Sequence, residues 1–136
     1  MQIELLTSPT AHEKLGDLIE LLQDAVDSGA SVGFLPPLSH DTASDYWRSV
    51  FADLDAGHRL LLGAMDGSRL VGSVQLELAL KPNASHRAEV QRLLVFRSAR
   101  RQGIGEGLMR QLHELARQHG RTLLVLDTRE GEPSEL

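Results

Sequence analysis

The sequence of 136 residues contains no cysteine. Disulfide bonds and thiolate chemistry are therefore excluded, which fits the reducing cytoplasm. No apolar run approaches the roughly 18 residues of a membrane span. The start of the chain, Met1–Leu6, also lacks the basic and apolar regions of a secretory signal. We therefore expect a cytoplasmic protein without a membrane partner.

Basic residues are in short supply as well. There are 14 lysines and arginines against 19 aspartates and glutamates, and the formal net charge is -5. This charge disfavours general binding to nucleic acid or to an anionic membrane surface. The six histidines are scattered without the spacing of metal ligands, so no metal site is predicted. The length and the 41% of hydrophobic residues suit one domain, residues 1–136, with a single core.

The acidic balance reverses in one segment. Residues 92–110 contain five arginines and one acid, Glu106, which gives the segment a charge of about +4. Three glycines, Gly103, Gly105 and Gly107, alternate there at the start of a helical pattern. Each interior glycine costs about 1 kcal/mol relative to alanine, so this helix start needs bare backbone for another purpose. An anion is the expected occupant, and a solvated basic loop is the alternative that charge alone leaves open.

The first half of the chain predicts one strand and two helices. The strand covers residues 3–6, and apolar residues then recur at helical intervals in two stretches. Capping residues and glycines are expected to bound the helices: Thr10 with Glu13 as a capping box and then Gly29 for the first, Asp41 or Thr42 and then Gly57 for the second.

A hairpin is predicted next. Residues 59–65 and 69–80 read as strands, and Asp66-Gly67-Ser68 between them is a strong turn signal. In the second strand five apolar residues occupy even positions, whereas Ser73, Gln75 and Glu77 occupy odd ones; the five are Leu70, Val74, Leu76, Leu78 and Leu80. This alternation is typical of an antiparallel strand that is buried on one face only.

The second half predicts a strand, a helix and another strand. In the strand at residues 87–96, the alternation breaks at Gln91-Arg92, which indicates a bulge that redirects the strand. A helix at residues 103–119 and a buried strand at residues 122–127 follow. Such a βαβ unit makes its two strands parallel. The expected fold class is therefore α+β (α/β), with a mixed, mostly antiparallel sheet flanked by helices.

Other motifs fit less well. The stretch Gly29–Gly33 matches G-x-S-x-G, but a nucleophile elbow needs a strand before the serine, and here a helix precedes Ser31. The His-Glu pairs at His12 and His113 both lack the second histidine of H-E-x-x-H. Neither a serine hydrolase nor a zinc protease is therefore favoured.

A dinucleotide-binding fingerprint is a closer alternative. Alternating glycines open a helix after a strand, and Asp127 ends the next strand where a ribose ligand would stand. However, the third glycine comes one position early, and the stretch from Phe96 to Gly103 is too long for the tight turn of that motif. NAD is therefore the less favoured ligand.

One combination remains: the bulged strand at 87–95, the motif Arg100-x-x-Gly103-x-Gly105, and the strand Leu123–Thr128. It resembles the GCN5-related N-acetyltransferase (GNAT) family, whose core motif is [Q/R]-x-x-G-x-[G/A] after a bulged strand. The order of the predicted elements is also similar to that family. Residues 30–34, 81–83 and 126–128 most resemble the tabtoxin-resistance type of small-molecule acetyltransferase.

The resemblance implies acetyl-CoA as co-substrate. Glycines and a helix start allow a diphosphate to approach unpaired backbone amides. The Val95 amide would lie near the thioester oxygen as an oxyanion donor. The cofactor-binding residues implied are Leu93, Leu94 and Val95 for pantetheine, Arg100 at the basic position of the motif, and the backbone amides of Arg101, Gln102, Gly103, Ile104, Gly105 and Glu106 for the pyrophosphate.

In this family an amine attacks the thioester directly, so the enzyme positions the amine and accepts its proton. Glu89, just before the bulge, is the expected general base, acting directly or through water, and Asp127 is the second candidate. A solvent-facing strand glutamate and a strand-end aspartate bound to loop amides are the alternatives. The implied activity is acetyl transfer to a primary amine of a small molecule, such as an antibiotic or a toxin.

Two departures from the family pattern affect these expectations. Arg97 stands where a proline is usual. Family members also continue with a helix, whose tyrosine commonly protonates the CoA thiolate, and two further strands, whereas this sequence ends at Leu136. We therefore expect a C-terminally shortened fold, whose exposed strand edge favours a homodimer. Tyr46, the sole tyrosine, is expected in the core. A CoA-binding module with impaired catalysis is the alternative function.

Overall fold

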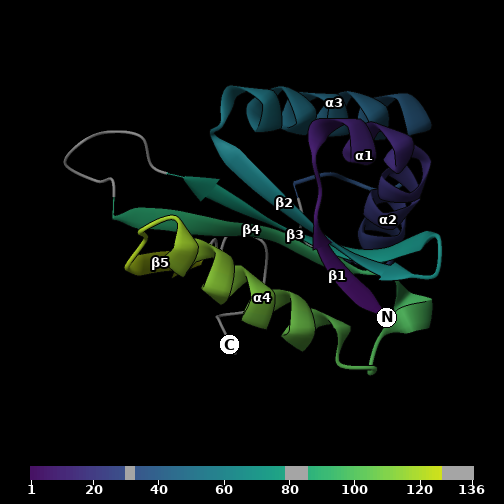
Figure 1. Ribbon diagram of the computed structural model, residues 1–136. Coiled ribbons are helices and arrows are strands. Elements are labelled where there is room, and N and C mark those ends of the chain that lie inside the picture. Colours follow the sequence, from purple (N-terminus) through teal and green to yellow (C-terminus); the bar gives the residue numbers. More distant parts are fainter. Residues whose placement is uncertain (30–32, 79–85, 127–136) are drawn as a thin grey trace.

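The structure of the chain is a computed structural model that describes residues 1–29, 33–78 and 86–126. Five strands form one sheet, and helices lie on both of its sides, with α1, α2 and α3 on one side and α4 on the other (Figure 1). The elements, in chain order, are β1 (Gln2–Leu5), α1 (Ser8–Glu13), α2 (Leu15–Asp27), α3 (His40–Ala56), β2 (Arg59–Asp66), β3 (Arg69–Leu78), β4 (Arg87–Val95), a 3₁₀ helix (Arg97–Ala99), α4 (Ile104–Gln118) and β5 (Leu123–Leu126).

The strand order in the sheet is β1-β2-β3-β4-β5. Neighbouring strands from β1 to β4 are antiparallel, whereas β4 and β5 are parallel. The helix α4 connects these two parallel strands, as expected of a βαβ unit. The predicted fold class is therefore confirmed, and the hairpin between β2 and β3 turns at Gly67 and Ser68, since Asp66 pairs with Arg69.

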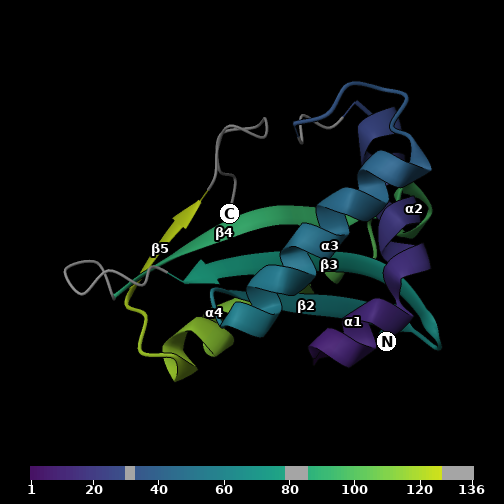
Figure 2. The same cartoon turned by 90° about the horizontal axis from the view of Figure 1, so that it is seen from above.

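Both faces of the central strand β3 are buried, which corrects the expectation of a half-buried strand. Ser73 and Gln75, two of the polar residues at its odd positions, are both 0% exposed. The reason is that α2 packs against β3 and α3 against the adjacent β2, while α4 covers the opposite face. Seen from above, α3 crosses the strands obliquely and leaves β5 uncovered (Figure 2).

The helix starts differ from those predicted. Thr7 rather than Thr10 caps α1, because its backbone is extended and its Oγ1 accepts a hydrogen bond from the Thr10 N–H at 3.4 Å. Ser39 caps α3 in the same way, with its Oγ accepting from the Thr42 N–H at 3.1 Å. The predicted first helix is divided at Lys14 into α1 and α2. The helix end at Gly57 is confirmed.

The predicted bulge in β4 is present. Ser73 of β3 pairs with Leu94, and Gln75 pairs with Gln91, so two steps along β3 correspond to three along β4. Arg92, inside this interval, has a left-handed backbone with φ 54°. The extra residue gives β4 the local kink and twist that bulges produce.

Helix α4 approaches the sheet closely at Gly72 of β3. A Cβ atom there would lie 3.1 Å from Ile104 Cγ2 and 3.1 Å from the Leu94 carbonyl oxygen. The backbone oxygen cannot move without disturbing β4, so we expect Gly72→Ala to lower the free energy of unfolding by about 1–3 kcal/mol. Urea denaturation measures this change.

Gly16 in α2 supplies the matched control, since a Cβ there meets nothing within 4 Å. Gly16→Ala should raise the free energy of unfolding by up to about 1 kcal/mol, because alanine favours the helix and restricts the unfolded chain. Equal stability of both variants would show that α4 does not pack on Gly72 as described.

Candidate functional site

The bulge moves the side chains of β4 from one face of the sheet to the other. Before it, the Gln91 side chain lies on the face that α3 covers, where its Nε2 donates to Glu77 Oε2 at 3.0 Å. After it, Leu93 lies on the α4 side, because a Cβ at Gly105 would be 3.8 Å from Leu93 Cδ2. Odd-numbered residues thus face opposite sides before and after the extra residue, as a one-residue shift of a period-two pattern requires.

A cavity of about 380 Å³ lies between the end of β4 and the start of α4. It brings together most of the residues that the sequence implicates in cofactor binding. Leu94 is 3% exposed and does not line the cavity, and neither does Gln102. The lining residues are Leu93, Val95, Ala99, Arg100, Arg101, Gly103, Ile104, Gly105 and Glu106.

The start of α4 presents unpaired amides. Gly103 is the N-cap and has no side chain to accept a hydrogen bond from the first turn. The first backbone bond of the helix runs from the Gly107 N–H to the Gly103 carbonyl at 2.9 Å. The N–H groups of Ile104, Gly105 and Glu106 therefore have no acceptor within the helix. Together with the partial positive charge of a helix N-terminus, they suit an anion.

Each glycine of the alternating series has its own environment. Gly103 has φ 77°, a left-handed conformation that glycine adopts at little cost. A Cβ at Gly105 would have ample space, whereas a Cβ at Gly107 would lie 3.0 Å from Ile3 Cδ1 of β1. Gly107 thus allows α4 to pack closely on β1 rather than serving the anion site.

The arginines of residues 92–110 have different partners. Arg97 pairs with Asp24 at 3.0 Å and Arg110 with Glu106 at 2.9 Å, whereas Arg92 lies over the Tyr46 ring. Among the described residues, Arg100 and Arg101 form no ion pair, and both line the cavity. The segment is therefore not a uniformly solvated basic loop, and two of its cations remain next to the helix start.

The residue at the usual proline position also has a specific contact. The Arg97 N–H donates to Asp24 Oδ2 at 2.8 Å, and Arg97 Nε donates to Asp24 Oδ1 at 3.0 Å. A proline could not make the first of these bonds, because it has no N–H group. Arg97 thus ties the end of β4 to α2.

The edge of β4 beyond the bulge faces the cavity. Within the described residues, which end at Leu126, β5 pairs with β4 from Arg87 to Val90. The Phe96 N–H points toward β3 and donates to the carbonyl of Val71 in that strand at 3.0 Å. Since successive residues of a strand direct their N–H groups to opposite edges, the Val95 N–H points away from β3. The carbonyl on that edge, Val95 O, accepts from Arg100 Nε at 3.3 Å.

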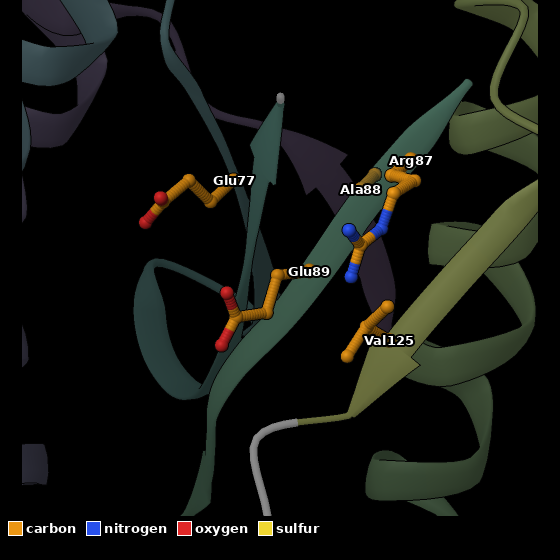
Figure 3. A pocket seen from close by; sticks show the side chains of 5 residues that line it. All are labelled: Glu77, Arg87, Ala88, Glu89 and Val125. Atoms are coloured by element: carbon orange, nitrogen blue, oxygen red, sulfur yellow. The ribbon is translucent and has the colours of Figure 1, made fainter. Parts of the chain in front are cut away.

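A second cavity, of about 220 Å³, adjoins β4 before the bulge and contains Glu89 (Figure 3). Glu89 pairs in register with Glu77 of β3. Glu77 Oε2 accepts from Arg59 Nη2 and Gln91 Nε2, both at 3.0 Å, whereas Glu89 has no hydrogen-bond or ion-pair partner among the described residues. The residues that line this second cavity are Glu77, Arg87, Ala88, Glu89 and Val125.

Some predicted positions lie outside the described residues. These are the second base candidate Asp127, the serine Ser31, residues 81–83, and the end of the sequence from residue 127 onward. In residues 1–29, 33–78 and 86–126, no group of three histidine, aspartate or glutamate side chains is placed to hold a metal ion. No helix within those ranges is long and apolar enough to cross a membrane.

Sequence reasoning missed a polar network on the α3 face. Arg59 of β2 donates to Gln75 Oε1 at 2.9 Å and also to Gln91 Oε1. Tyr46, expected in the core, is only partly buried, and its hydroxyl accepts from Gln75 Nε2 and Arg92 Nε, both at 3.0 Å. The signal that could have revealed the network is the run of polar odd positions in β3, a strand with neighbours on both sides.

Residues 20–134 match the acetyltransferase (GNAT) family. An uncharacterised N-acetyltransferase from the hisH-hisA intergenic region of Azospirillum brasilense is 33% identical over 119 residues, which are 85% of this chain and 68% of that protein.

Two solved structures show the same fold. The ribosomal-protein-alanine N-acetyltransferase from Brucella melitensis has a TM-score of 0.65 at 24% identity, covering 93% of this chain and 78% of its own. An aminoglycoside acetyltransferase from an uncultured soil metagenomic sample, in complex with sisomicin, has a TM-score of 0.70 at 17% identity, covering 93% and 76%. Because the family match spans most of the sequence, this chain belongs to the acetyltransferase (GNAT) family of acetyl-CoA-dependent N-acetyltransferases.

Proposed function

We propose that the protein transfers the acetyl group of acetyl-CoA to a primary amine of a small molecule, by direct attack in a ternary complex. The observation that carries this proposal is that β4 lines two cavities, one on each side of its bulge. Glu89 belongs to the cavity before the bulge, and Val95 belongs to the cavity after it. A donor and an acceptor bound there would meet at the bulge.

The cavity after the bulge fits CoA. Its diphosphate would accept hydrogen bonds from the amides at the start of α4, where no side chain of Gly103 or Gly105 obstructs the approach. The guanidinium groups of Arg100 and Arg101 would add charge-assisted contacts from the rim. Pantetheine would pair with the edge of β4 at Leu93 and Val95, which β5 leaves open.

The edge of β4 also suits the thioester. The Val95 N–H, directed away from β3, would donate to the thioester oxygen and stabilise the negative charge that develops there during attack. The Val95 carbonyl on the same edge accepts a hydrogen bond from Arg100 Nε. Its guanidinium would have to release that carbonyl for pantetheine to use it.

Glu89 is the proposed general base. An amine is protonated at neutral pH and must lose a proton before its nitrogen can attack the thioester carbon. Glu89 faces the acceptor cavity without a partner among the described residues, so its carboxylate is available to take that proton directly or through water. The new N–C bond then forms while the C–S bond breaks, and the second proton that the nitrogen loses reaches the departing CoA thiolate through solvent. Asp127 stays the second candidate.

The cavity beside Glu89 suits the amine-bearing end of an acceptor. About 220 Å³ is room for a small organic amine or for one end of a larger molecule. The carboxylates of Glu77 and Glu89 lie on adjacent strands there and would attract an ammonium group (Figure 3). An antibiotic or toxin amine therefore stays the proposed acceptor class.

A homodimer through the outer edge of β5 is the proposed assembly, since exposed edges invite pairing.

The diphosphate site can be tested with a substitution that separates stability from binding. Gly105→Asp places a carboxylate in the first turn of α4, where it interacts favourably with the helix dipole but repels a diphosphate. We expect the dissociation constant of CoA to rise by about tenfold or more, as for loss of a charge-assisted contact. The thermal midpoint should not fall. Calorimetric titration and thermal unfolding measure the two quantities.

Gly105→Asn is the matched control, because asparagine has nearly the same shape without the charge. It should weaken CoA binding much less than Gly105→Asp does. Equal CoA affinity of the aspartate variant and the unaltered protein would contradict a diphosphate at this helix start. A thermal shift with NAD but none with CoA would overturn the proposed donor as a whole.

Removing the proposed base should affect turnover rather than donor binding. We expect Glu89→Gln to lower kcat by about 10²- to 10⁴-fold, which is the usual contribution of a general base. CoA affinity should be unchanged, because Glu89 lies outside the CoA cavity. The assay follows thiol release from acetyl-CoA with a panel of diamines, amino acids and aminoglycosides.

Glu114→Gln on the exposed face of α4 is the control and should retain full activity. If Glu89→Gln is as active as the control, Glu89 is not the base. If the unaltered protein binds CoA but releases no thiol with any amine, the alternative of a CoA-binding module with impaired catalysis is supported instead.

A further inference from the structure

Arg92 adopts an unfavourable backbone conformation inside the bulge. It is one of two non-glycine residues with positive φ in the described part of the chain. For a residue with a Cβ, this conformation is sterically disfavoured and persists only where the surroundings hold it. The contacts of the Arg92 side chain are therefore expected to stabilise the bulge.

The Arg92 side chain contacts Tyr46 of α3. Arg92 Nε donates to the Tyr46 hydroxyl at 3.0 Å, and the guanidinium carbon lies 5.3 Å from the centre of the Tyr46 ring. The ring itself is held edge-on by Phe34 at 5.8 Å and by Trp47 at 5.1 Å between centroids. Tyr46 is thus a fixed support against which the Arg92 side chain rests by a hydrogen bond and a cation–π contact.

The other residue of the bulge is held from the same network. Gln91 donates to Glu77 and accepts from Arg59, and Arg59 in turn donates to Gln75. Gln75 is fully buried, and its Nε2 donates to the Tyr46 hydroxyl at 3.0 Å. Both bulge residues are therefore anchored to one continuous set of side chains.

We infer that Tyr46 is a positioning residue for the cofactor. Through Arg92 it holds the bulge that turns Leu93 and Val95 toward the cavity at the start of α4, although Tyr46 does not line that cavity. This inference rests on the proposed function, because it takes CoA as the occupant of that cavity. An aromatic residue on the α3 face of the sheet would thus determine the position of the β4 edge that binds the cofactor on the α4 side.

Tyr46→Phe tests this role, since it removes the hydroxyl and keeps the ring. The dissociation constant of CoA should rise by about three- to tenfold, which is less than the full contribution of a hydrogen bond to a charged group, because the cation–π contact with the ring remains. The KM for acetyl-CoA should rise in parallel while kcat at saturating acetyl-CoA stays near its original value. Arg48→Ala, on the exposed side of α3, should change neither quantity.

Arg92 variants show whether Tyr46 acts through Arg92. Arg92→Ala should weaken CoA binding as well, and Tyr46→Phe should have no additional effect in that background, because the contact is already lost. Arg92→Gly should bind CoA better than Arg92→Ala, since glycine adopts the left-handed conformation without strain. Additive effects of Tyr46→Phe and Arg92→Ala would overturn the inference.

Hydrogen exchange of the backbone amides from Leu93 to Phe96, measured without ligand, follows the bulge independently of CoA. Tyr46→Phe should accelerate this exchange. If the unaltered protein does not bind CoA, the proposed function fails. If it binds CoA and Tyr46→Phe binds equally well, the proposed function stands and the positioning role is overturned. A lower kcat with unchanged CoA affinity would also overturn it, because Tyr46 would then act on the chemical step.

Discussion

A single extra residue in β4 determines how the remainder of the site is arranged. Before the bulge, Glu89 faces the cavity on the α3 side of the sheet, and after it, Leu93 faces α4. Under the proposed function, the same strand would therefore serve an acceptor on one side and CoA on the other. If the same residues continued as a regular strand without a bulge, the period-two alternation would direct Glu89 and Leu93 to one face.

The bulge has an energetic cost that its side chains offset. A left-handed backbone at a residue with a Cβ costs roughly 1–2 kcal/mol. A hydrogen bond to a charged group contributes about 1.5–3 kcal/mol, so the bond from Arg92 to Tyr46 is by itself of the size needed. The bonds of Gln91 to Glu77 and Arg59 add to this. The burial of polar residues beneath α3 is thus explained, since their hydrogen bonds stabilise a conformation that the backbone alone disfavours.

Features encoded by neighbouring residues were predictable from the sequence, and those that depend on packing were not. The phase break at Gln91-Arg92 predicted the bulge, and the alternating glycines predicted a helix start with bare amides. The partner of Arg92, however, is Tyr46, 46 residues earlier, and nothing local indicates that pairing. Burial of Gln75 likewise depends on helices packed across both faces. Helix caps were misplaced because several serines, threonines and aspartates compete near each start, and only backbone geometry selects one.

The loop between β4 and α4 shows how a departure from the family motif can be offset by tertiary contacts. A proline at position 97 would stiffen the loop by fixing its own φ. Here Arg97 instead donates from its backbone and its side chain to Asp24 of α2. Arg100, three residues later, donates to the Ser28 hydroxyl at the end of the same helix. The loop is thus attached to α2 at two points, and the order that proline would supply locally comes from a neighbouring helix. The loop between β4 and α4 therefore depends on the packing of α2, which under the proposed function would tie the stability of that helix to CoA binding.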